Sequence, residues 1–238
     1  MNYALILAGG SGSRTGQDIP KQFLHIHDKP VIAYTLGVFE ESPHIDGIVV
    51  VCRTGWHNVV EAYCAQYGIS KLKKIVVGGS TRLDSIQNGM RAIEDACAPQ
   101  DTDLLVIFDA NRPLLTHGIL DACLAGGEKH GICVPALPCY DWMLELDNGN
   151  SAHKSVRREV LFHTQTPEVA RFSLAREALA CAPRLDTDSL SGLASIMTAM
   201  GRPVHLCAGS QRLIKITTAE DFELVKALMT AQKTDWLK

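Results

Sequence analysis

Residues 4–23 read ALILAGGSGSRTGQDIPKQF, and this stretch establishes how the fold begins. An apolar run leads directly into a glycine-rich turn, GGSG at residues 9–12, and two cations follow at Arg14 and Lys21. A continuous apolar run that ends at glycines is typical of a buried strand in a parallel sheet. Ligands of such sheets bind at the carboxyl ends of the strands, where this turn lies. We therefore expect the turn and the two cations to contribute to a ligand site.

Apolar, partly β-branched runs recur along the chain and alternate with segments that have helical spacing. The expected strands cover residues 3–8, 47–52, 74–79, 104–110, 131–137 and 204–209. The expected helices cover residues 31–39, 81–96, 169–179 and 188–200, and a last helix follows residues 215–222. At the start of this last helix, Thr217 and Glu220 have the spacing of a capping box. Buried strands separated by helices predict an α/β fold in which helices cover both faces of a mostly parallel sheet.

The pattern changes between about residues 138 and 166. This segment contains the turn signal DNGN at residues 147–150, flanked by segments of mixed polarity. Such a signal predicts a hairpin, or arm, that projects from the sheet. The chain has no internal repeat, linker or low-complexity segment, so we expect residues 1–238 to form a single domain that carries this arm.

The bulk composition restricts the class of protein. The 238 residues carry a formal net charge of −3 and are 46% apolar, as in ordinary globular proteins. A near-neutral balance argues against a sequence-independent nucleic-acid binder, and no apolar stretch is long enough to span a bilayer. Met1 leads almost directly into the first expected strand, so no signal peptide is expected and a cytoplasmic location is predicted.

The eight cysteines are expected to be reduced thiols. None forms a Cys-x-x-Cys pair, and several lie in apolar runs, where a thiol behaves as a small hydrophobic side chain. The spacing of the cysteines therefore does not predict a zinc site.

The glycine-rich turn is suited to bind an anion. Glycines let successive backbone N–H groups approach a phosphate, Arg14 can hold phosphate oxygens through two parallel hydrogen bonds, and Lys21 is a compact cation on a flexible side chain. The turn lacks the Gly-Lys-Ser/Thr ending of a Walker A loop, and Thr15 stands where the dinucleotide fingerprint needs its third glycine. A solvated turn with two surface cations is the alternative interpretation of this stretch alone.

Six motifs in order make the interpretation more specific. They are LAGGSGSR…PKQF (residues 7–23), GGSTRLDSI (78–86), FDANRP (108–113), QTPE (165–168), DTDSLS (186–191) and IKIT (214–217). In this order they resemble the motifs of the cytidylyltransferase family that contains 2-C-methyl-D-erythritol 4-phosphate cytidylyltransferase and D-ribitol-5-phosphate cytidylyltransferase. The resemblance spans essentially the whole chain. It implies a Rossmann-like nucleotidyltransferase fold and a reaction in which CTP and a polyol phosphate give a CDP-polyol and pyrophosphate.

The resemblance implies roles for the charged residues of these motifs. Arg14 and Lys21 would hold the triphosphate, while Lys21 and Lys215 would stabilise the pentacoordinate α-phosphorus. Because the attacking phosphate oxygen is already anionic, the reaction needs alignment and charge neutralisation rather than a general base. Asp109 follows an apolar strand and is the best candidate ligand for Mg²⁺, which favours carboxylate and phosphate oxygens. A helix cap or turn residue is the alternative role for Asp109.

The nucleotide-binding residues implied by the resemblance come from three of the motifs. They are Ala8, Gly9, Gly10, Gly12, Gly79, Arg82, Ser85, Asp109 and Ala110. Gly79, Arg82 and Ser85 match the segment that contacts the base in the family. Ser80 or Thr81 could also cap the helix that follows, since a helix N-terminus that points at a nucleotide serves both purposes.

The arm is implied to take part in acceptor binding. In the family, the arms of two subunits embrace and reach the acceptor of the neighbouring site, which implies an active homodimer. The catalytic arginine implied for this arm is Arg158, counted eight residues before Thr166, with the adjacent Arg157 as the alternative. The implied acceptor-binding residues are Arg112, Asp141, Trp142 and Thr166.

Four positions depart from the family pattern. Phe108 stands where a histidine precedes the family's aspartate, and Asn111 replaces a small residue. Trp142 replaces a threonine that would contact the acceptor, and Arg212-Leu213 replaces the pair before IKIT. Trp142 matters most, because an indole offers one N–H donor and a large apolar face in place of a hydroxyl group. Alternatively, Trp142 packs the arm at the dimer contact.

The resemblance implies a CTP-dependent cytidylyltransferase, and we expect it to transfer CMP to D-ribitol 5-phosphate or a related alditol phosphate, for wall or capsule polymer synthesis. The alternative acceptor is 2-C-methyl-D-erythritol 4-phosphate, which would place the enzyme in isoprenoid precursor synthesis. A second class is a non-catalytic nucleotide-binding homologue, in which Phe108 and Arg212 would mark a degraded metal site. A nicotinamide-dependent dehydrogenase lacks support, because the fingerprint is incomplete and Arg53 stands where the acidic ribose ligand belongs.

Overall fold

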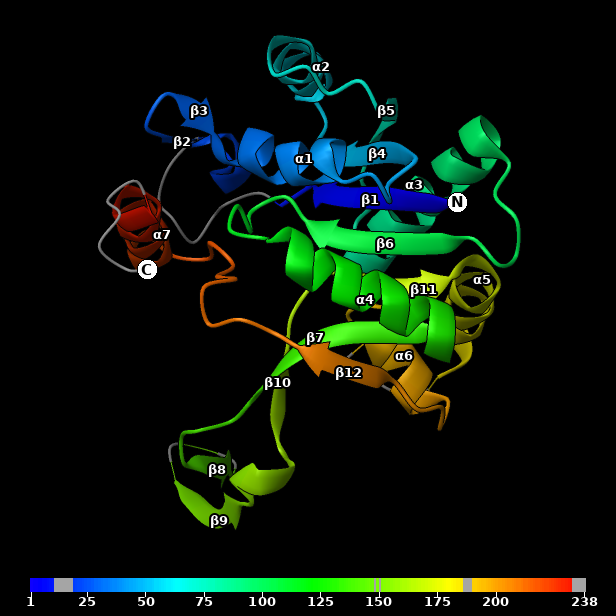
Figure 1. Cartoon of the computed structure of the whole chain (residues 1–238). Helices are drawn as coiled ribbons and strands as arrows, with labels where there is room; N and C mark the ends of the chain where they lie inside the picture. The colour runs from blue at the N-terminus through cyan, green and yellow to red at the C-terminus, as the bar shows by residue number, and fades with distance from the viewer. Residues whose placement is uncertain (11–18, 148, 150, 186–189, 233–238) are drawn as a thin grey trace.

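A computed structural model describes residues 1–10, 19–147, 149, 151–185 and 190–232. The central sheet is built on β1 (Asn2–Ala8), which lies between β4 (Gly47–Cys52) and β6 (Leu104–Asp109) and is parallel to both (Figure 1). Beyond β4, β5 (Leu72–Val77) extends the sheet in the same direction. Every residue of β4 and β6 is buried, which explains why these strands read as unbroken apolar runs. The strands expected in the first half of the chain are confirmed.

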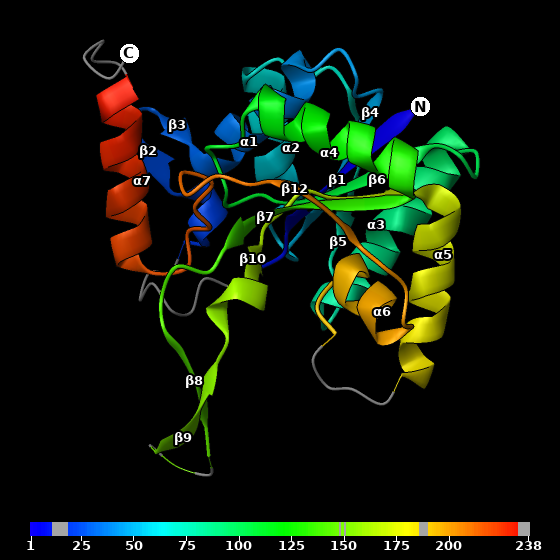
Figure 2. The same ribbon diagram turned by 60° about the horizontal axis from the view of Figure 1, so that its bottom comes forward.

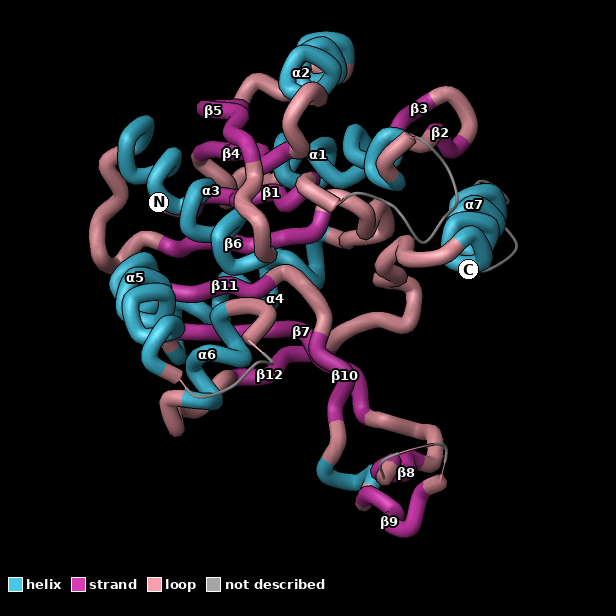
Figure 3. Tube along the Cα trace, turned by 180° about the vertical axis from the view of Figure 1, so that it is seen from behind, coloured by secondary structure: helices cyan, strands magenta, loops and turns pink. Residues whose placement is uncertain are grey.

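The other half of the sheet lies beyond β6 (Figure 3), and its strand pairings are both parallel and antiparallel. The strand β11 (Glu168–Arg171) is antiparallel to β6 and to β7 (Ile132–Pro138). Two further strands pair with β7: β12 (His205–Ala208) in parallel and β10 (Phe162–Thr164) in the antiparallel direction.

The prediction of a helix over residues 169–179 is wrong at the start of that range. Residues 169–171 belong to β11, and α5 (Phe172–Cys181) begins only after them. Val169 and Ala170 are buried because β11 lies between two other strands. A short apolar segment does not by itself distinguish a buried strand from a turn of helix, so the sequence pattern alone did not reveal β11.

Helices cover both faces of the sheet, as the alternation predicted (Figure 2). One face carries α1 (Val31–Glu41), α2 (His57–Gln66) and α4 (His117–His130). The other face carries α3 (Arg82–Cys97), α5 and α6 (Leu193–Ala199). Alternate residues of β1 enter the two cores, Ala4 and Ile6 on one face and Tyr3 and Leu5 on the other. Among the described residues, no helix has the length and apolar character needed to cross a membrane.

Two helix starts differ from the expectation. The helix expected over residues 188–200 is shorter, since α6 begins at Leu193, and residues 186–189 lie outside the described part. The last helix, α7 (Ala219–Gln232), is capped by Thr218 and Asp221 rather than by Thr217 and Glu220. Thr218 N donates to the Asp221 carboxylate at 2.8 Å, and Asp221 N donates to Thr218 Oγ1 at 3.2 Å. Both pairs have the same spacing, so the sequence did not distinguish the two registers.

The helix α7 packs beside the small hairpin of β2 (His25–Ile26) and β3 (Lys29–Pro30) (Figure 1). Val225 of α7 shares an apolar cluster with Ile26 and with Ile216, which lies just before the helix. This packing fixes the segment that leads into α7 against the body of the protein.

The chain between β7 and β10 leaves the sheet as the expected arm (Figure 1). Its hairpin consists of β8 (Met143–Leu146) and β9 (Ala152–Val156), and a short 3-10 turn follows at Arg158–Val160. Asp147 N donates to Ser151 O at 3.0 Å and closes the hairpin where the DNGN turn was expected. Residues 148 and 150 of that turn lie outside the described part.

Candidate active site

A cavity of about 510 Å³ opens at the carboxyl ends of β1, β5 and β6. Its wall combines segments from both ends of the chain. The described residues that line it are Leu7, Gly9, Gly10, Lys21, Gln22, Gly79, Ser80, Thr81, Arg82, Ser85, Asp109, Asn111, Lys215 and Thr217. The position is the one at which open parallel sheets bind ligands.

The start of the glycine-rich turn is fixed by Gln22, which sequence reasoning did not identify. Gln22 is buried, and its Nε2 donates to Ala8 O at 2.6 Å and to Gly10 O at 3.4 Å. The signal available in the sequence was its place next to Lys21 in PKQF. Gly12 and Arg14 lie outside the described residues. Two other candidates, Ala8 and Ala110, are buried and do not line the cavity.

Lys21 lies at the start of a 3-10 turn, Lys21–Phe23, directly beside the cavity. Phe23 anchors this turn by stacking on Trp56, with ring centroids 4.2 Å apart and rings nearly parallel. The Lys21 side chain is buried against the wall, and Nζ donates to Thr217 O at 2.5 Å. The contact joins the first motif to the last across almost the whole length of the chain.

Lys215 enters the cavity from the segment that precedes α7. The end of β6 holds this segment through two hydrogen bonds: Asn111 Nδ2 donates to Ile216 O at 2.6 Å, and Ile216 N donates to Asn111 O at 3.0 Å. Lys215 Nζ lies 3.0 Å from Asp109 Oδ2. Asn111, which departs from the family pattern, therefore positions the strip of chain that carries Lys215.

Asp109 is the buried anion around which several cations gather. Besides Lys215, its carboxylate lies 3.5 Å from Arg112 Nε and 3.7 Å from Arg82 Nη2, and Thr166 Oγ1 donates to it at 3.5 Å. Burial acts to raise the pKa of Asp109, but Lys215, Arg82 and Arg112 outweigh burial and lower the pKa. Asp109 is therefore ionised at neutral pH.

The start of α3 forms the far wall of the cavity. Thr81 is the N-cap, because its side chain accepts from Asp84 N at 3.0 Å while Asp84 accepts from Thr81 N at 3.0 Å. Gly79 N donates to Ser85 Oγ at 3.1 Å. A Cβ on Gly79 would stand 2.1 Å from Asp84 Cβ, so only glycine permits this close approach of chain and helix. Thr81 is thus one of the two caps expected for this helix, and both Ser80 and Thr81 line the cavity, while their contact with a nucleotide stays a prediction.

A second cavity of about 580 Å³ adjoins the first and shares Arg82, Asp109 and Lys215 with it. Arg112 and Thr166 line this second cavity only. Arg82 lines both cavities and contacts two residues of the second one: its Nη1 lies 3.1 Å from Glu168 Oε1 and donates to Ser191 O. Glu168 is a second residue that sequence reasoning missed, although it stands where the family has glutamine in Thr-Pro-Gln.

The arm residues Asp141, Trp142 and Arg158 line neither cavity within this chain. Trp142 is 76% exposed, and the Arg158 guanidinium lies 5.7 Å from the centroid of its ring. Arg158 Nη1 also donates to Tyr140 O at 3.0 Å. The structure therefore places these three residues together on the arm, apart from Asp109 and Lys215.

The two positions suspected of marking a degraded metal site lie away from the cavity wall. Phe108 is fully buried and packs edge-to-face on Phe39, with centroids 5.3 Å apart. Because side chains alternate along β6, Phe108 faces the core while Asp109 faces the cavity. Arg212 is exposed and does not line the cavity.

Comparisons with known proteins identify the family to which the chain belongs. The family model described as 2-C-methyl-D-erythritol 4-phosphate cytidylyltransferase (IspD) matches residues 3–231. The chain is 32% identical over 231 residues to the ribitol-5-phosphate cytidylyltransferase of Lacticaseibacillus paracasei, covering 96% of this chain and 98% of that protein. It is 37% identical over 238 residues to the 2-C-methyl-D-erythritol 4-phosphate cytidylyltransferase of Geobacter metallireducens, covering 95% of this chain and 97% of that protein.

A solved structure is similar along its whole length. The crystal structure of the 2-C-methyl-D-erythritol 4-phosphate cytidylyltransferase from Thermus thermophilus has a TM-score of 0.73 and 26% identity, covering 97% of this chain and 100% of that chain. The relatives in both comparisons are named cytidylyltransferases, which are nucleotidyltransferases. The chain therefore belongs to the 2-C-methyl-D-erythritol 4-phosphate cytidylyltransferase family of enzymes.

Proposed function

We propose that this enzyme transfers CMP from CTP to D-ribitol 5-phosphate or a related alditol phosphate and releases pyrophosphate. The observation that carries the proposal is the gathering of cations around one cavity. Lys21 and Lys215 line it, and Arg82 and Arg112 contact Asp109 at its end. None of the described lining residues is a histidine. Fixed cations without an imidazole base suit the attack of an anionic phosphate oxygen on a phosphorus centre.

In the proposed step, an acceptor phosphate oxygen forms a bond to the α-phosphorus as the bond to the pyrophosphate oxygen breaks in line with it. Lys21 and Lys215 come from opposite ends of the chain and would neutralise the charge that develops on the α-phosphate oxygens. Lys215 exchanges its contact with Asp109 for a phosphate oxygen, and its side chain, 38% exposed, has room for that movement. The assignment of Arg14 to the triphosphate stays a prediction from the sequence.

The end of β6 fits a magnesium site that the nucleotide completes. Asp109 Oδ2 is held by Lys215 at 3.0 Å, whereas Oδ1 has Arg82 at 3.7 Å. The more loosely held Oδ1 is available as a ligand, and Mg²⁺ commonly uses one or two carboxylates and takes its other ligands from phosphates and water. Asp109 would therefore hold the ion together with phosphate oxygens, and Mg²⁺ bound there supplies charge neutralisation on the triphosphate.

The nucleotide would lie along the cavity from the glycine turn to the start of α3. Backbone amides of Gly9 and Gly10 would meet the triphosphate, and the same role for Gly12 stays a prediction from the sequence. Gly79 and Ser85 would offer small neutral groups to the cytosine ring, whose exocyclic amine and carbonyl oxygen require a donor and an acceptor rather than a charge.

We further propose that the enzyme acts as a homodimer through the arm. The arm carries large apolar side chains that are each at least 49% exposed: Tyr140, Trp142, Leu144, Leu146, Val160 and Phe162. A group of exposed apolar side chains on a projecting element commonly marks a protein interface. The arm of a second copy would bring its Asp141 and Arg158 to the acceptor, which Arg112 and Thr166 bind from the first copy. Sedimentation and activity measured over the same dilution series test this, since full activity in a strictly monomeric species would contradict it.

The choice of acceptor rests on Trp142. Its large exposed ring, paired with Arg158, replaces a threonine hydroxyl in the family and changes the shape of the acceptor site that the arm would complete. Pyrophosphate release with D-ribitol 5-phosphate, other alditol phosphates and 2-C-methyl-D-erythritol 4-phosphate tests the proposal. We expect the alditol phosphates to give the higher kcat/KM. Turnover of 2-C-methyl-D-erythritol 4-phosphate alone would establish the alternative function.

A non-catalytic nucleotide-binding role is less well supported. Lys21, Asp109 and Lys215 share one cavity, and the suspect positions Phe108 and Arg212 do not line it. Magnesium-dependent turnover with any acceptor would exclude this role. We also propose that residues 1–238 form a single domain. A cytoplasmic location is proposed as well, because free thiols stay reduced there.

A further inference from the structure

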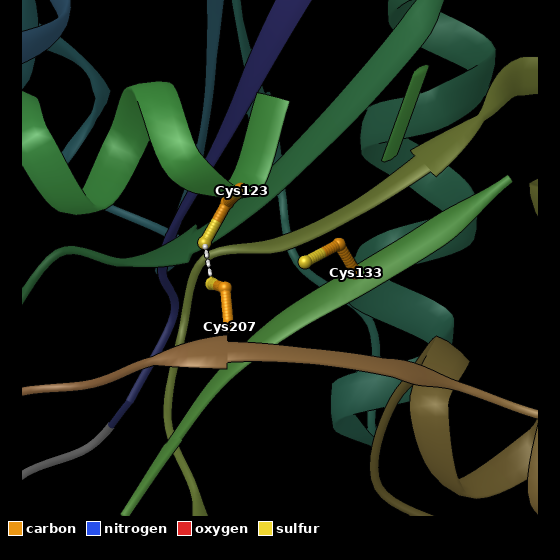
Figure 4. Close-up of side chains that lie close together, drawn as sticks. All are labelled: Cys123, Cys133 and Cys207. Atoms are coloured by element: carbon orange, nitrogen blue, oxygen red, sulfur yellow. Dashed lines mark hydrogen bonds between the residues drawn. The ribbon is translucent and has the colours of Figure 1, made fainter. Parts of the chain in front are cut away.

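Three cysteines far apart in the sequence bring their sulfur atoms together beneath α4 (Figure 4). Cys123 belongs to α4, Cys133 to β7 and Cys207 to β12. The three sulfur atoms lie within 4.8 Å of one another, and Cys123 Sγ and Cys207 Sγ are 3.3 Å apart. None of the three lines the active-site cavity or the cavity adjoining it.

The strand register and a close helix contact produce this cluster. Cys133 pairs with His205 and Pro135 pairs with Cys207 in the parallel register of β7 and β12. Residues two apart face the same side of a sheet, so both cysteines point toward α4. At Gly126, a Cβ would stand 2.4 Å from Cys133 Sγ, so the helix approaches closely enough to place Cys123 beside the other two.

We propose that Cys123, Cys133 and Cys207 form a binding site for a thiophilic cation, with Cu(I) as the best-fitting ion. The donor set is made only of sulfur, which selects soft ions such as Cu(I). Structural zinc sites use four ligands, whereas the described residues supply three here. Three sulfurs in a plane about 2.3 Å from a central ion stand about 4 Å apart. The 3.3 Å pair would open slightly to reach that spacing.

An ion has a route to this site. Cys123 and Cys133 are fully buried, but Cys207 is half-buried and borders a small surface cavity of about 330 Å³. Each thiol that binds as a thiolate releases its proton to solvent, a sulfur–metal bond forms, and no electron is transferred. The single positive charge of Cu(I) offsets the charge of one thiolate, which would otherwise be costly in this apolar region. Bound there, it would join α4, β7 and β12.

Anaerobic titration with Cu(I), supplied as its acetonitrile complex in competition with a Cu(I) chelator, tests the site. The wild-type protein is expected to retain one equivalent. Cys123→Ala, Cys133→Ala and Cys207→Ala should each weaken binding by about 100-fold or more. The matched controls are Cys52→Ala for a buried thiol and Cys181→Ala for a half-buried one, and both should bind as the wild type does. Circular dichroism establishes that each variant is folded.

Thermal unfolding of the wild type supplies a second readout that needs no variant. Free Cu(I) at a hundredfold excess over Kd should raise Tm by about 5–10 °C. The proposal is wrong if the chelator removes all Cu(I) and Tm does not rise, or if folded Cys123→Ala binds as tightly as the wild type. Loss of two free thiols in air by a protein that binds no Cu(I) would also overturn it, and would indicate a disulfide pair instead.

Discussion

Replacing Asn111 with alanine tests whether the end of β6 holds the lysine-bearing segment in place. Asn111 Nδ2 donates to Ile216 O at 2.6 Å. Ile216 is fully buried, so the variant leaves this carbonyl without its side-chain donor in the interior. An unsatisfied buried acceptor costs about 1–3 kcal/mol. For a chain of this size, that cost corresponds to a fall in Tm of roughly 2–12 °C.

The same change should reduce catalysis, because Ile216 lies between two residues that determine where the lysines lie. Lys215 itself precedes Ile216, and Thr217, whose carbonyl accepts a hydrogen bond from Lys21 Nζ, follows it. If displacement of the segment removes about 1.4–2.8 kcal/mol of transition-state stabilisation, kcat/KM for CTP falls by about 10- to 100-fold.

Pyrophosphate release, measured well below the Tm of the variant, reports this loss. Asn88→Ala is the matched control, since Asn88 Nδ2 donates to Val77 O at 3.2 Å but the residue does not line the cavity. It should leave kcat/KM nearly unchanged. Asn111→Ala should also reduce kcat/KM by a smaller factor in a Lys215→Met background, because both changes then act on the same lysine contact. An equally large effect in that background would refute the reasoning.

Three further changes test the contacts around the cavity. Gln22→Ala removes the 2.6 Å donor to Ala8 O and should lower the free energy of unfolding by about 1–3 kcal/mol, measured in urea. Gly79→Ala places a methyl group 2.1 Å from Asp84 Cβ and should raise KM for CTP by displacing the start of α3; an unchanged KM would contradict this. For Asp109, burial raises the pKa but the surrounding cations lower it below the unfolded value of about 3.9. Its charge therefore stabilises the fold above that pH, and the contribution is lost as pH falls through the folded pKa. Thermal melting curves recorded as the pH is lowered should show a smaller fall in Tm for Asp109→Asn than for the wild type.

The fold was predictable wherever burial left a periodic pattern. The strands β4 and β6 are covered on both faces and therefore read as unbroken apolar runs. The motifs also led to Lys21, Asp109 and Lys215, which the structure brings to one cavity. The antiparallel insertion of β11 was not predictable, because four residues carry too little periodicity to separate strand from helix.

By itself, the sequence determined the six strands β1, β4, β5, β6, β7 and β12, the projecting arm and the cationic residues of the motifs, since these follow from patterns within short segments. Only the tertiary structure decided that Gln22 holds the glycine turn, that Asn111 holds the segment of Lys215, and that Phe108 faces the core. It also brought the three cysteine sulfurs together from α4, β7 and β12. The physical reason is that such contacts depend on strand register and on how closely a helix approaches the sheet, and neither is encoded in the spacing of residues along one segment.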